Sequence, residues 1–413
     1  MKRDILDQAF SAMRFNLRRT ILTTLGMAWG IATVVLLLAY GDGFARAIAN
    51  IFESFGARAV GIYPGRTSQQ AGGNKAGSQI RFTKDDIELL RNVAPLIRHL
   101  SRVGDKEVKV QSLARSFTFT VTGVDPDMGD IWNLQMAQGR FLNDGDDVDH
   151  AHVAVLGSEA KDKLFSGMPA LGETVHLNGI TFLVVGVLKP RMQEGDNDAN
   201  RTVFIPYSSL DTLQDTHYVQ GIWLDFAGQD HIRMTKIIRD SLAVAHNFRP
   251  DDMRAVFIFD AQKQLEQFNI ITLGLKILLA FIGTLTLGIG GVGLTNMMLV
   301  SVTQRTREIG VEKALGARKR DIMFQFLAEA LVISAVGGLF GILLSYVVAI
   351  SVGRITLYSA MASHAEAGDI YLLIAPKTLL IATTILGVVG VVSGMFPAVR
   401  AANLDPIEAL RYE

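Results

Sequence analysis

Cysteine is absent from this sequence of 413 residues, so disulfide bonds, thiolate nucleophiles and cysteine-ligated metal sites are excluded. Charged residues are scarce, at 19% of the chain against about a quarter in soluble domains. Lys plus Arg and Asp plus Glu number 40 each, so no net charge attracts nucleic acid or an anionic substrate, and we expect no nucleic-acid partner. Hydrophobic residues reach 49%, which indicates membrane segments combined with an aqueous part.

Motifs for common enzyme chemistry are also missing. The sequence has no Gly-x-x-x-x-Gly-Lys-Ser/Thr loop for nucleotide phosphates, because Gly310 and Gly316 are too far apart and no lysine follows them directly. It has no His-Glu-x-x-His motif, and its 8 histidines are scattered. The acidic run 144–152 lacks the glycine and terminal glutamate of a calcium loop, so we predict a solvated loop there. We expect no catalytic residue, no metal site and no directly bound cofactor.

Long runs without charge are the strongest positive signal. A charge inside a bilayer costs at least a few kcal/mol, and about 20 apolar residues cross its hydrocarbon core. The charge-free runs are 20–41, 277–304, 330–353 and 378–399. Lys276 and Glu329 lie only at the edges of such runs, so no string of buried ionisable groups supports an ion or proton pathway. We predict transmembrane helices over 20–41, 269–300, 327–353 and 377–399.

Basic residues predict the orientation of these spans. Lys and Arg cluster in 1–19 and again between the second and third spans, whereas the segment 354–376 has few. By the positive-inside rule, both termini and the loop 301–326 are cytoplasmic, and the tail 400–413 with them. Residues 1–19 have helical apolar spacing, which predicts an amphipathic helix on the inner membrane surface. The alternative is a cleaved signal peptide, because Ala45-Arg46-Ala47 resembles a cleavage site, but the first run is longer than a usual signal core.

Glycines four residues apart occur in three of the predicted spans. The pairs are Gly26 with Gly30, Gly337 with Gly341, and Gly390 with Gly394. Such pairs allow helix backbones to approach closely, either within one chain or at a dimer seam. Both alternatives remain open from the sequence.

Residues 42–268, between the first two spans, contain many charges and short strand patterns, which predicts a large α+β extracytoplasmic domain. Helical apolar spacing near 44–55 and 265–271 predicts two stalks to the membrane. Within the domain we expect a helix starting at Thr83 with Asp86 at its third position, and a mobile glycine-rich loop over 65–79. The expected strands are 108–113, 116–124, 153–156, 174–177, 181–188, 203–205 and 255–259, with a tight Asn-Gly turn at 178–179 and a helix near 229–247.

The segment 305–327 mixes charged and apolar residues and is punctuated by Gly310 and Gly316. This pattern suits a short helix on the cytoplasmic surface that a partner binds; the alternative is a solvated basic loop. The run 303–329, with its elements Arg-Thr-Arg-Glu-Ile-Gly, Lys-Ala-Leu-Gly-Ala and Gln-Phe-Leu-Ala-Glu-Ala, resembles the cytoplasmic loop of MacB/FtsX-type ABC transporter permeases. The tail AANLDPIEALRYE is similar to the C-terminus of that family, and Asp405 is placed to cap a short helix that begins at Pro406. The external segments 136–141, 153–157 and 181–188 resemble the MacB-like periplasmic core domain.

The resemblance implies a permease half-transporter in the bacterial inner membrane, with its large domain in the periplasm. It implies a homodimer or a related heterodimer, surrounded by membrane lipid, and a periplasmic adaptor as a further partner. ATP and Mg²⁺ are expected on a separate ABC ATPase subunit, because no ATPase domain precedes the predicted amphipathic helix here. The residues that would couple to the ATPase are Arg305, Arg307, Glu308, Lys313, Ala314, Leu315, Gly316 and Ala317.

The function implied is ATP-driven export or extraction of an envelope substrate, such as a drug, a peptide or a lipoprotein. An FtsX-like transmembrane regulator of an external cell-wall hydrolase is the alternative. A third, receptor-like interpretation has the external domain sensing a ligand without any ATPase. The large size of the external domain favours the first interpretation.

Overall fold

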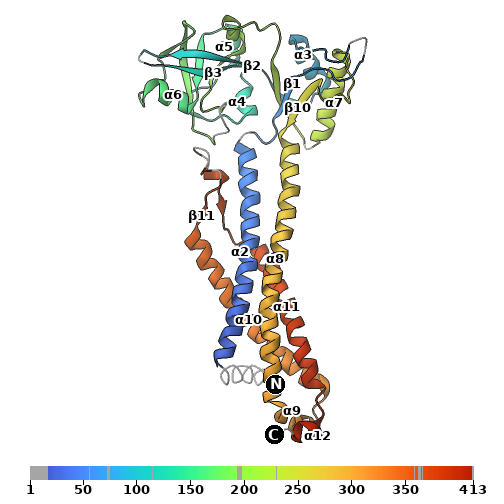
Figure 1. The fold of residues 1–413 in the computed structure, drawn as a ribbon. Coiled ribbons are helices and arrows are strands. Elements are labelled where there is room, and N and C mark those ends of the chain that lie inside the picture. The colour runs from blue at the N-terminus through green and yellow to red at the C-terminus, as the bar shows by residue number, and fades with distance from the viewer. Residues whose placement is uncertain are drawn as a thin grey trace. The chain divides into compact units, whose positions relative to one another are not determined.

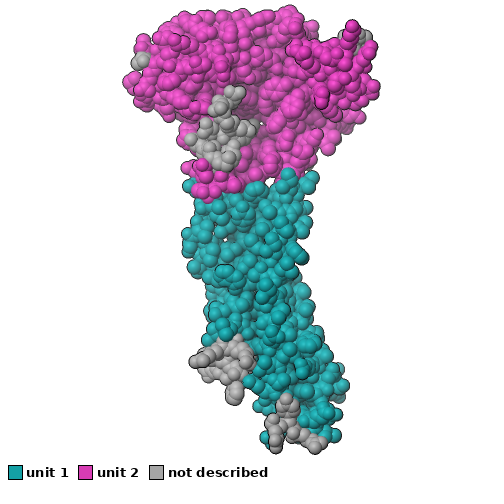
Figure 2. All heavy atoms as spheres, viewed as in Figure 1, with its two compact units in different colours: residues 1–46, 270–355, 370–413 teal, residues 47–269, 356–369 magenta. Residues whose placement is uncertain are grey.

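The structure is a computed structural model that describes residues 17–54, 56–71, 75–113, 115–192, 198–228, 230–357, 359–360, 364 and 366–411. The chain divides into two compact units (Figure 2). Unit 1 comprises residues 1–46, 270–355 and 370–413, and unit 2 comprises residues 47–269 and 356–369. Most of the helix predicted over 1–19 lies outside the described residues.

Four long apolar helices confirm the predicted spans (Figure 1). They are α2 (Leu17–Ser54), α8 (Ala261–Gln304), α10 (Lys319–Val352) and α11 (Pro376–Ala402). Each contains a window with mean hydropathy between 2.1 and 2.3. The remaining elements of this part of the chain are α9 (Thr306–Ala314), α12 (Pro406–Arg411), η2 (Glu366–Gly368) and the short hairpin of β11 (Arg354–Ile355) and β12 (Ile370–Tyr371).

The two predicted stalks are continuations of the span helices. Helix α2 runs unbroken to Ser54, and α8 already begins at Ala261. In unit 2 these helix ends meet through Phe52 and Phe268, whose ring centroids lie 5.6 Å apart. The apolar spacing that predicted the stalks therefore reflects packing of one helix end on the other.

The glycine pairs serve helix packing within the chain. A Cβ added at Gly30 would lie 2.8 Å from the Cα of Leu287, and one at Gly341 would lie 1.9 Å from Cγ2 of Ile31. A Cβ at Gly394 would come within 2.6 Å of the Ala330 side chain. Such contacts are shorter than any side chain tolerates, so these positions require glycine for close approach of α2, α8, α10 and α11.

Unit 2 is built on a 10-stranded sheet with the order β10-β1-β9-β2-β3-β8-β5-β7-β4, and β6 pairs with β2 and β7. The strands are β1 (Val60–Pro64), β2 (Ile97–Gln111), β3 (Ser116–Val124), β4 (Met136–Gly139), β5 (Val153–Leu156), β6 (Thr174–Leu177), β7 (Ile180–Leu188), β8 (Val203–Pro206), β9 (Gly221–Phe226) and β10 (Val256–Asp260). The helices are α3 (Lys84–Val93), α4 (Met128–Ile131), α5 (Asp144–Val148), α6 (Ser158–Phe165), η1 (Tyr207–Thr212) and α7 (His231–Ala245). Together they confirm the predicted α+β domain between the first two spans.

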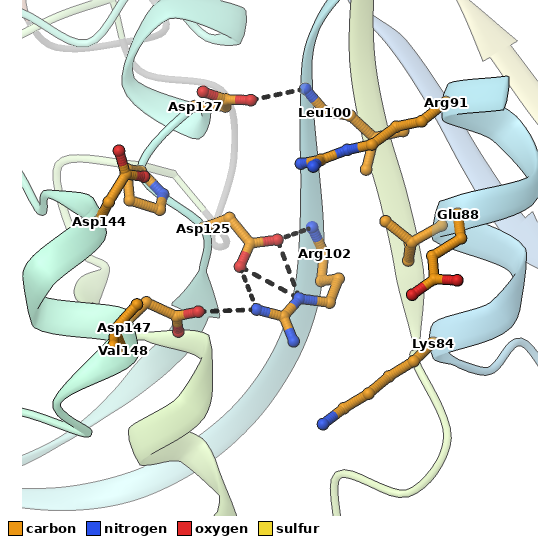
Figure 3. Close-up of a pocket in the computed structure, with 12 residues that line it drawn as sticks. Lys84, Glu88, Arg91, Leu100, Arg102, Asp125, Asp127, Asp144, Asp147 and Val148 are labelled. Atoms are coloured by element: carbon orange, nitrogen blue, oxygen red, sulfur yellow. Dashed lines mark hydrogen bonds and ion pairs between the residues drawn. The ribbon is translucent and has the colours of Figure 1, made fainter.

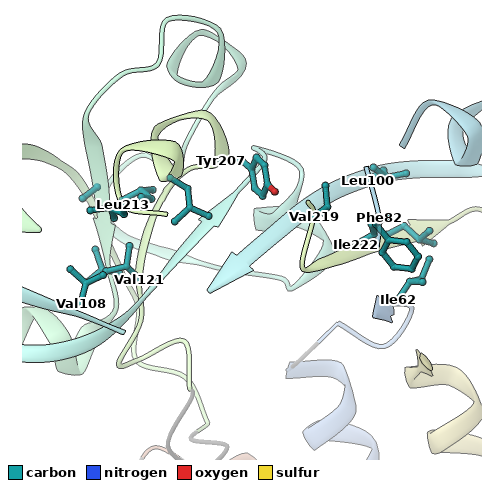
Figure 4. Packing of buried hydrophobic residues seen from close by; sticks show 14 of the residues in the cluster. Ile62, Phe82, Leu100, Val108, Val121, Tyr207, Leu213, Val219 and Ile222 are labelled. Atoms are coloured by element: carbon teal, nitrogen blue, oxygen red, sulfur yellow. The ribbon is translucent and has the colours of Figure 1, made fainter. Parts of the chain in front are cut away.

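The long strand β2 contributes to the main hydrophobic core cluster of this unit at two places along its length (Figure 4). At one end Leu100 packs near Phe82 and Ile222, and toward the other end Val108 packs near Val121. All these side chains are almost completely buried. Their burial fixes which face of β2 packs on the core. Because a slip of one residue would turn the other face inward, it also fixes the register with the neighbouring strands.

Local signals in unit 2 were predicted well. The Thr83 N–H donates to the Asp86 carboxylate at 2.8 Å, and α3 ends at Val93 before the proline. Asn178 and Gly179 both have positive φ, as the tight turn between β6 and β7 requires. The first half of β2 and the strands β1, β4 and β9 were not predicted.

Two predictions about loops were wrong in part. Residues 144–148 of the acidic run form the short helix α5, and Asp146 is buried in an ion pair with Arg140 at 2.5 Å, so this residue is not simply solvated. In the predicted loop 65–79, the described residues Ser68 and Gln69 donate backbone N–H groups to buried Asp252 at 2.6 and 3.0 Å. This part of the loop is tied down by hydrogen bonds.

Candidate functional site

The segment predicted to form a cytoplasmic, partner-binding helix is the short helix α9 followed by a tight turn. Gly316 has φ of +103°, a conformation that favours glycine. The turn allows the Ala317 N–H to donate back to the Glu312 carbonyl at 3.0 Å, which satisfies a free carbonyl at the helix end. The Arg318 N–H then donates to the Asp321 carboxylate at 3.1 Å, and this contact starts α10.

Arg305, which directly follows α8, forms ion pairs with residues of the next two helices, α9 and α10. Its Nε lies 3.0 Å from the carboxylate of Glu308 in α9, and its Nη1 lies 3.4 Å from Oε2 of Glu329 in α10. The guanidinium also lies over the ring of Phe326, 5.8 Å from its centroid. Because the Glu329 side chain is only 8% exposed, this contact satisfies a carboxylate that would otherwise be costly to bury.

Lys313 binds α9 to the end of α11. Its Nζ donates to the carbonyl oxygen of Ala402 at 3.0 Å and to that of Leu404. Ala402 is the last residue of α11, and the last carbonyls of a helix have no partner within it. The helix dipole favours a cation at this end. The Lys313 ammonium group therefore binds within the chain.

The residues predicted to couple to an ATPase divide into two sets. Arg307, Glu308, Ala314, Leu315 and Gly316 are exposed, whereas Arg305, Lys313 and Ala317 are half-buried. Leu315 is 85% exposed, a high value for a large apolar side chain. On the opposite face of α9, Ile309 is buried in a cluster with α8, α10 and α11 residues. The helix therefore has one face anchored to the bundle and one exposed face.

Sequence reasoning missed a second exposed apolar residue in this region. Helix α12 packs against α9 (Figure 1), and its Ile407 is 71% exposed while Ala409 is buried. The Ile407 N–H donates to the Asp405 carboxylate at 2.8 Å, so Asp405 caps the helix as predicted. Helix α12 is only six residues long, so its sequence has too few apolar residues to predict which of them is exposed.

At another level of unit 1, a charged contact connects three span helices. The Lys276 ammonium lies 2.8 Å from Asp42 in α2, and the Thr378 hydroxyl donates to the other Asp42 oxygen at 2.9 Å. Lys276, which the sequence placed at the edge of a span, therefore has an ion-pair partner in the neighbouring helix α2. The contact couples α2, α8 and α11.

The external unit has a polar cleft of about 370 Å³ between α3 and the α4–α5 region (Figure 3). Arg102 on β2 pairs with Asp125 and, at 2.9 Å, with Asp147 of α5. Burial alone would lower the pKa of Arg102, but the bond to Asp125 and the charge of Asp147 raise it above its usual value. The guanidinium stays charged and holds this wall of the cleft in place. Lysine, glutamate and arginine side chains of α3 form the facing wall (Lys84, Glu88 and Arg91).

Unit 2 also contains a buried histidine beside the start of α8. His231 Nδ1 lies 2.7 Å from Asp260, and its Nε2 lies 3.1 Å from Glu266. Burial lowers the pKa of His231, but the hydrogen bonds and charges of the two carboxylates outweigh this and raise it. Among the described residues, no group of three or more His, Asp or Glu side chains is arranged to hold a metal ion.

Comparison with known proteins agrees with the membrane helices, the external sheet and the α9 region. Residues 20–236 match the family described as MacB-like periplasmic core domain, and residues 280–406 match the FtsX-like permease C-terminal family. The chain thus has the architecture of an ABC transporter permease. It belongs to the MacB/FtsX family of these permeases, as the resemblance in its sequence predicted.

Several curated relatives align with almost the whole chain. The macrolide export ATP-binding/permease protein MacB of Bdellovibrio bacteriovorus is 31% identical over 99% of this chain and 61% of its own length. The pyoverdine export ATP-binding/permease protein PvdT of Pseudomonas entomophila is 32% identical over 99% of this chain and 60% of its own length. The chain therefore spans about 60% of the length of these relatives. The periplasmic region of MacB from Actinobacillus actinomycetemcomitans is similar at 20% identity, with a TM-score of 0.43, over 54% of this chain and 97% of that one.

Proposed function

We propose that this chain is the permease subunit of an ABC transporter and that it transmits ATP-driven motion of a separate ATPase subunit to its periplasmic domain. The observation that carries the proposal is the two-sided character of α9. Leu315 next to it is exposed to a partner, while Arg305 and Lys313 bind the helix region firmly to α10 and α11. A force applied to this surface passes into the span helices without first deforming the loop.

The length of the helices supports this mechanism. Helix α8 has 44 residues and α2 has 38, so α8 extends about 66 Å at 1.5 Å per residue. Closure of two ATPase subunits on ATP would push the α9 regions of two permease copies together. Each α8 would then carry the movement toward its external domain as a lever, and the substrate would be moved outside the bilayer.

The remaining features of the proposal follow from the family. The substrate is an envelope molecule such as a drug, peptide or lipoprotein, and the relatives named for macrolide and pyoverdine export support export over a regulatory role. The complex contains two permease copies, identical or related, and a periplasmic adaptor. It lies in the inner membrane with both termini, the loop 301–326 and the tail 400–413 in the cytoplasm, as the basic residues favour.

The proposal is tested first by isolating the full chain from its own membranes in detergent and identifying a co-purifying Walker-type ATPase. With the pair reconstituted in nanodiscs, the double variant Glu308→Ala plus Leu315→Ala should lower ATP hydrolysis by the complex at least about tenfold, since truncation of hot-spot residues near the centre of an interface costs about 2 kcal/mol or more and 1.4 kcal/mol corresponds to a factor of ten. The control is Leu113→Ala, which truncates a leucine that is 91% exposed in unit 2. Hydrolysis by the double variant at the control rate would contradict the proposal.

A further inference from the structure

Unit 2 contains a second cleft, of about 400 Å³, between helix α7 and the edge strand β10. The helix packs beside this strand (Figure 1), and the segment 250–253 and the first turn of α8 complete the lining. A volume of this size is typical of sites for small molecules. The side chains of the lining therefore indicate which kind of molecule the cleft accommodates.

One face of α7 lines the cleft with an apolar residue and two cations. Ile232, Lys236 and Arg239 are four and then three residues apart, so their side chains follow one side of the helix. Lys263, in the first turn of α8, adds a third cation to the lining. The cleft thus combines positive charge with apolar surface.

Arg239 has no carboxylate paired with it in the described part of the chain. Its side chain is half-buried, and its Nη1 donates to the carbonyl oxygens of Val256 at 3.1 Å and Asp252 at 3.5 Å. Burial lowers the pKa of Arg239 below its usual value, although the charges of Asp252 and Asp240 act in the opposite direction. An anion bound to this guanidinium would offset the cost of burying its charge.

Two of the three carboxylates in the lining already have partners. Asp251 pairs with Arg249 at 3.0 Å, and Asp260 bonds His231 at 2.7 Å. Asp240 is the lining carboxylate for which the described residues provide no such partner. Three lining cations thus stand against one unpaired carboxylate, and the cleft favours an anion.

Large apolar side chains lie in the same lining and are exposed. Ile232 is 68% exposed and Met253 65%. An inorganic anion would leave both of them in water, and an uncharged apolar molecule would leave Arg239 without a counter-ion. A molecule that carries both an anionic group and an apolar part satisfies the whole lining.

We propose that this cleft binds an anionic amphiphile, a molecule with a carboxylate or phosphate head and an alkyl chain. The head would lie against Arg239, Lys236 and Lys263, because an arginine fork binds two oxygens of either group. The chain would cover Ile232 and Met253. The inference goes beyond the proposed function and does not depend on an ATPase, so each of the two can fail without the other.

The absence of cysteine makes a direct test available, since Pro250→Cys places a single thiol in the lining. The rate of its labelling by a maleimide is measured in the full chain in nanodiscs, with free probe concentrations determined by dialysis. The probes are hexyl phosphate, hexanoate, inorganic phosphate and hexyltrimethylammonium. Val244→Cys is the control, because Val244 is 80% exposed on the same helix but lies outside the lining.

Hexyl phosphate, hexanoate or both should slow the labelling of Pro250→Cys to a saturating limit and leave that of Val244→Cys unchanged. Protection by hexyl phosphate alone would indicate a phospholipid-type head, and protection by hexanoate a carboxylate head. Inorganic phosphate should need at least about tenfold higher concentrations, since it lacks the apolar contact. Protection by neither anionic amphiphile overturns the proposal. Equal protection by hexyltrimethylammonium or by inorganic phosphate also overturns it, because the cleft would then select the chain alone or the anion alone.

Three further variants are made in the Pro250→Cys chain. Arg239→Gln should raise the concentration of the protecting amphiphile needed for half protection at least about tenfold. Lys236→Gln changes an exposed side chain and should also raise it, so the test does not depend on how the Arg239 variant folds. Arg233→Gln, which removes an exposed cation of α7 outside the lining, should leave it unchanged. The same half-protection concentration in all three variants would overturn the proposal.

Discussion

Replacing His231 with glutamine should remove most of the pH dependence of the stability of the external unit between about pH 6 and pH 8.5, the range in which histidine titrates. His231 connects α7 to the junction of β10 and α8, with Asp260 at 2.7 Å and Glu266 at 3.1 Å from its ring nitrogens. The same Asp260 carboxylate accepts the Lys263 N–H at the start of α8. The imidazole therefore stabilises the point where the sheet passes into the long helix.

The sign of the effect follows from the direction of the pKa shift. The two carboxylates raise the pKa of His231 in the folded chain above its value in the unfolded chain. The stabilisation is then fully present below the unfolded pKa of about 6.5 and is lost as the pH rises through the folded pKa. A buried, charge-assisted hydrogen bond to Asp260 contributes about 1.5–3 kcal/mol. Glu266 is 60% exposed, so its contribution is below about 1 kcal/mol.

The assay uses the tryptophans of the chain, of which there are 3. Trp132 and Trp223 lie in contact in unit 2, with centroids 5.2 Å apart, so Trp29→Phe leaves reporters of that unit only. Urea unfolding in nanodiscs should give a free energy about 2 kcal/mol higher at pH 6 than at pH 8.5, and the difference should largely vanish in His231→Gln. His217→Gln, a change at an exposed histidine, should keep it. An equal pH dependence in all three proteins would refute the reasoning.

Three further changes test the packing. Gly341→Leu should lower the unfolding temperature in nanodiscs, because its Cβ would overlap a side chain of α2, whereas Gly387→Leu, which has open space around it, should not. Lys276→Met should destabilise the bundle by leaving Asp42 without its ion pair, and adding Asp42→Asn should recover much of the loss; a double variant no more stable than the single one would contradict this. Phe182→Ala should cost about 3–5 kcal/mol in urea unfolding, since the side chain is fully buried, and a loss below about 1 kcal/mol would show that the site collapses freely.

Local chemistry explains which parts of the fold were predictable. The capping contact of Thr83 with Asp86 and the turn at Asn178 and Gly179 depend on residues close in sequence, so their patterns are complete in themselves. The first half of β2 shows no such pattern, since it alternates irregularly between charged and apolar residues. It is a strand because β9 and β3 pair with it from distant parts of the chain. The acidic run was misjudged for the same reason: Asp147 is paired with Arg102, which lies far away in the sequence.

The sequence by itself determined the four spans, the aqueous domain between the first two, and the family. Hydrophobicity summed over about 20 residues depends on composition alone, and the motifs that resemble the family are read directly from the sequence. Only the tertiary structure decided the partners of the charged groups. Lys313 looked like a cation offered to a partner, but its ammonium group binds the end of α11, and Lys276 binds Asp42. The sequence also left open whether the glycine pairs serve packing within the chain or a dimer seam. The structure shows that they lie where helices of this chain pack closely. A contact between distant residues depends on the whole fold, and no short stretch of sequence contains that information.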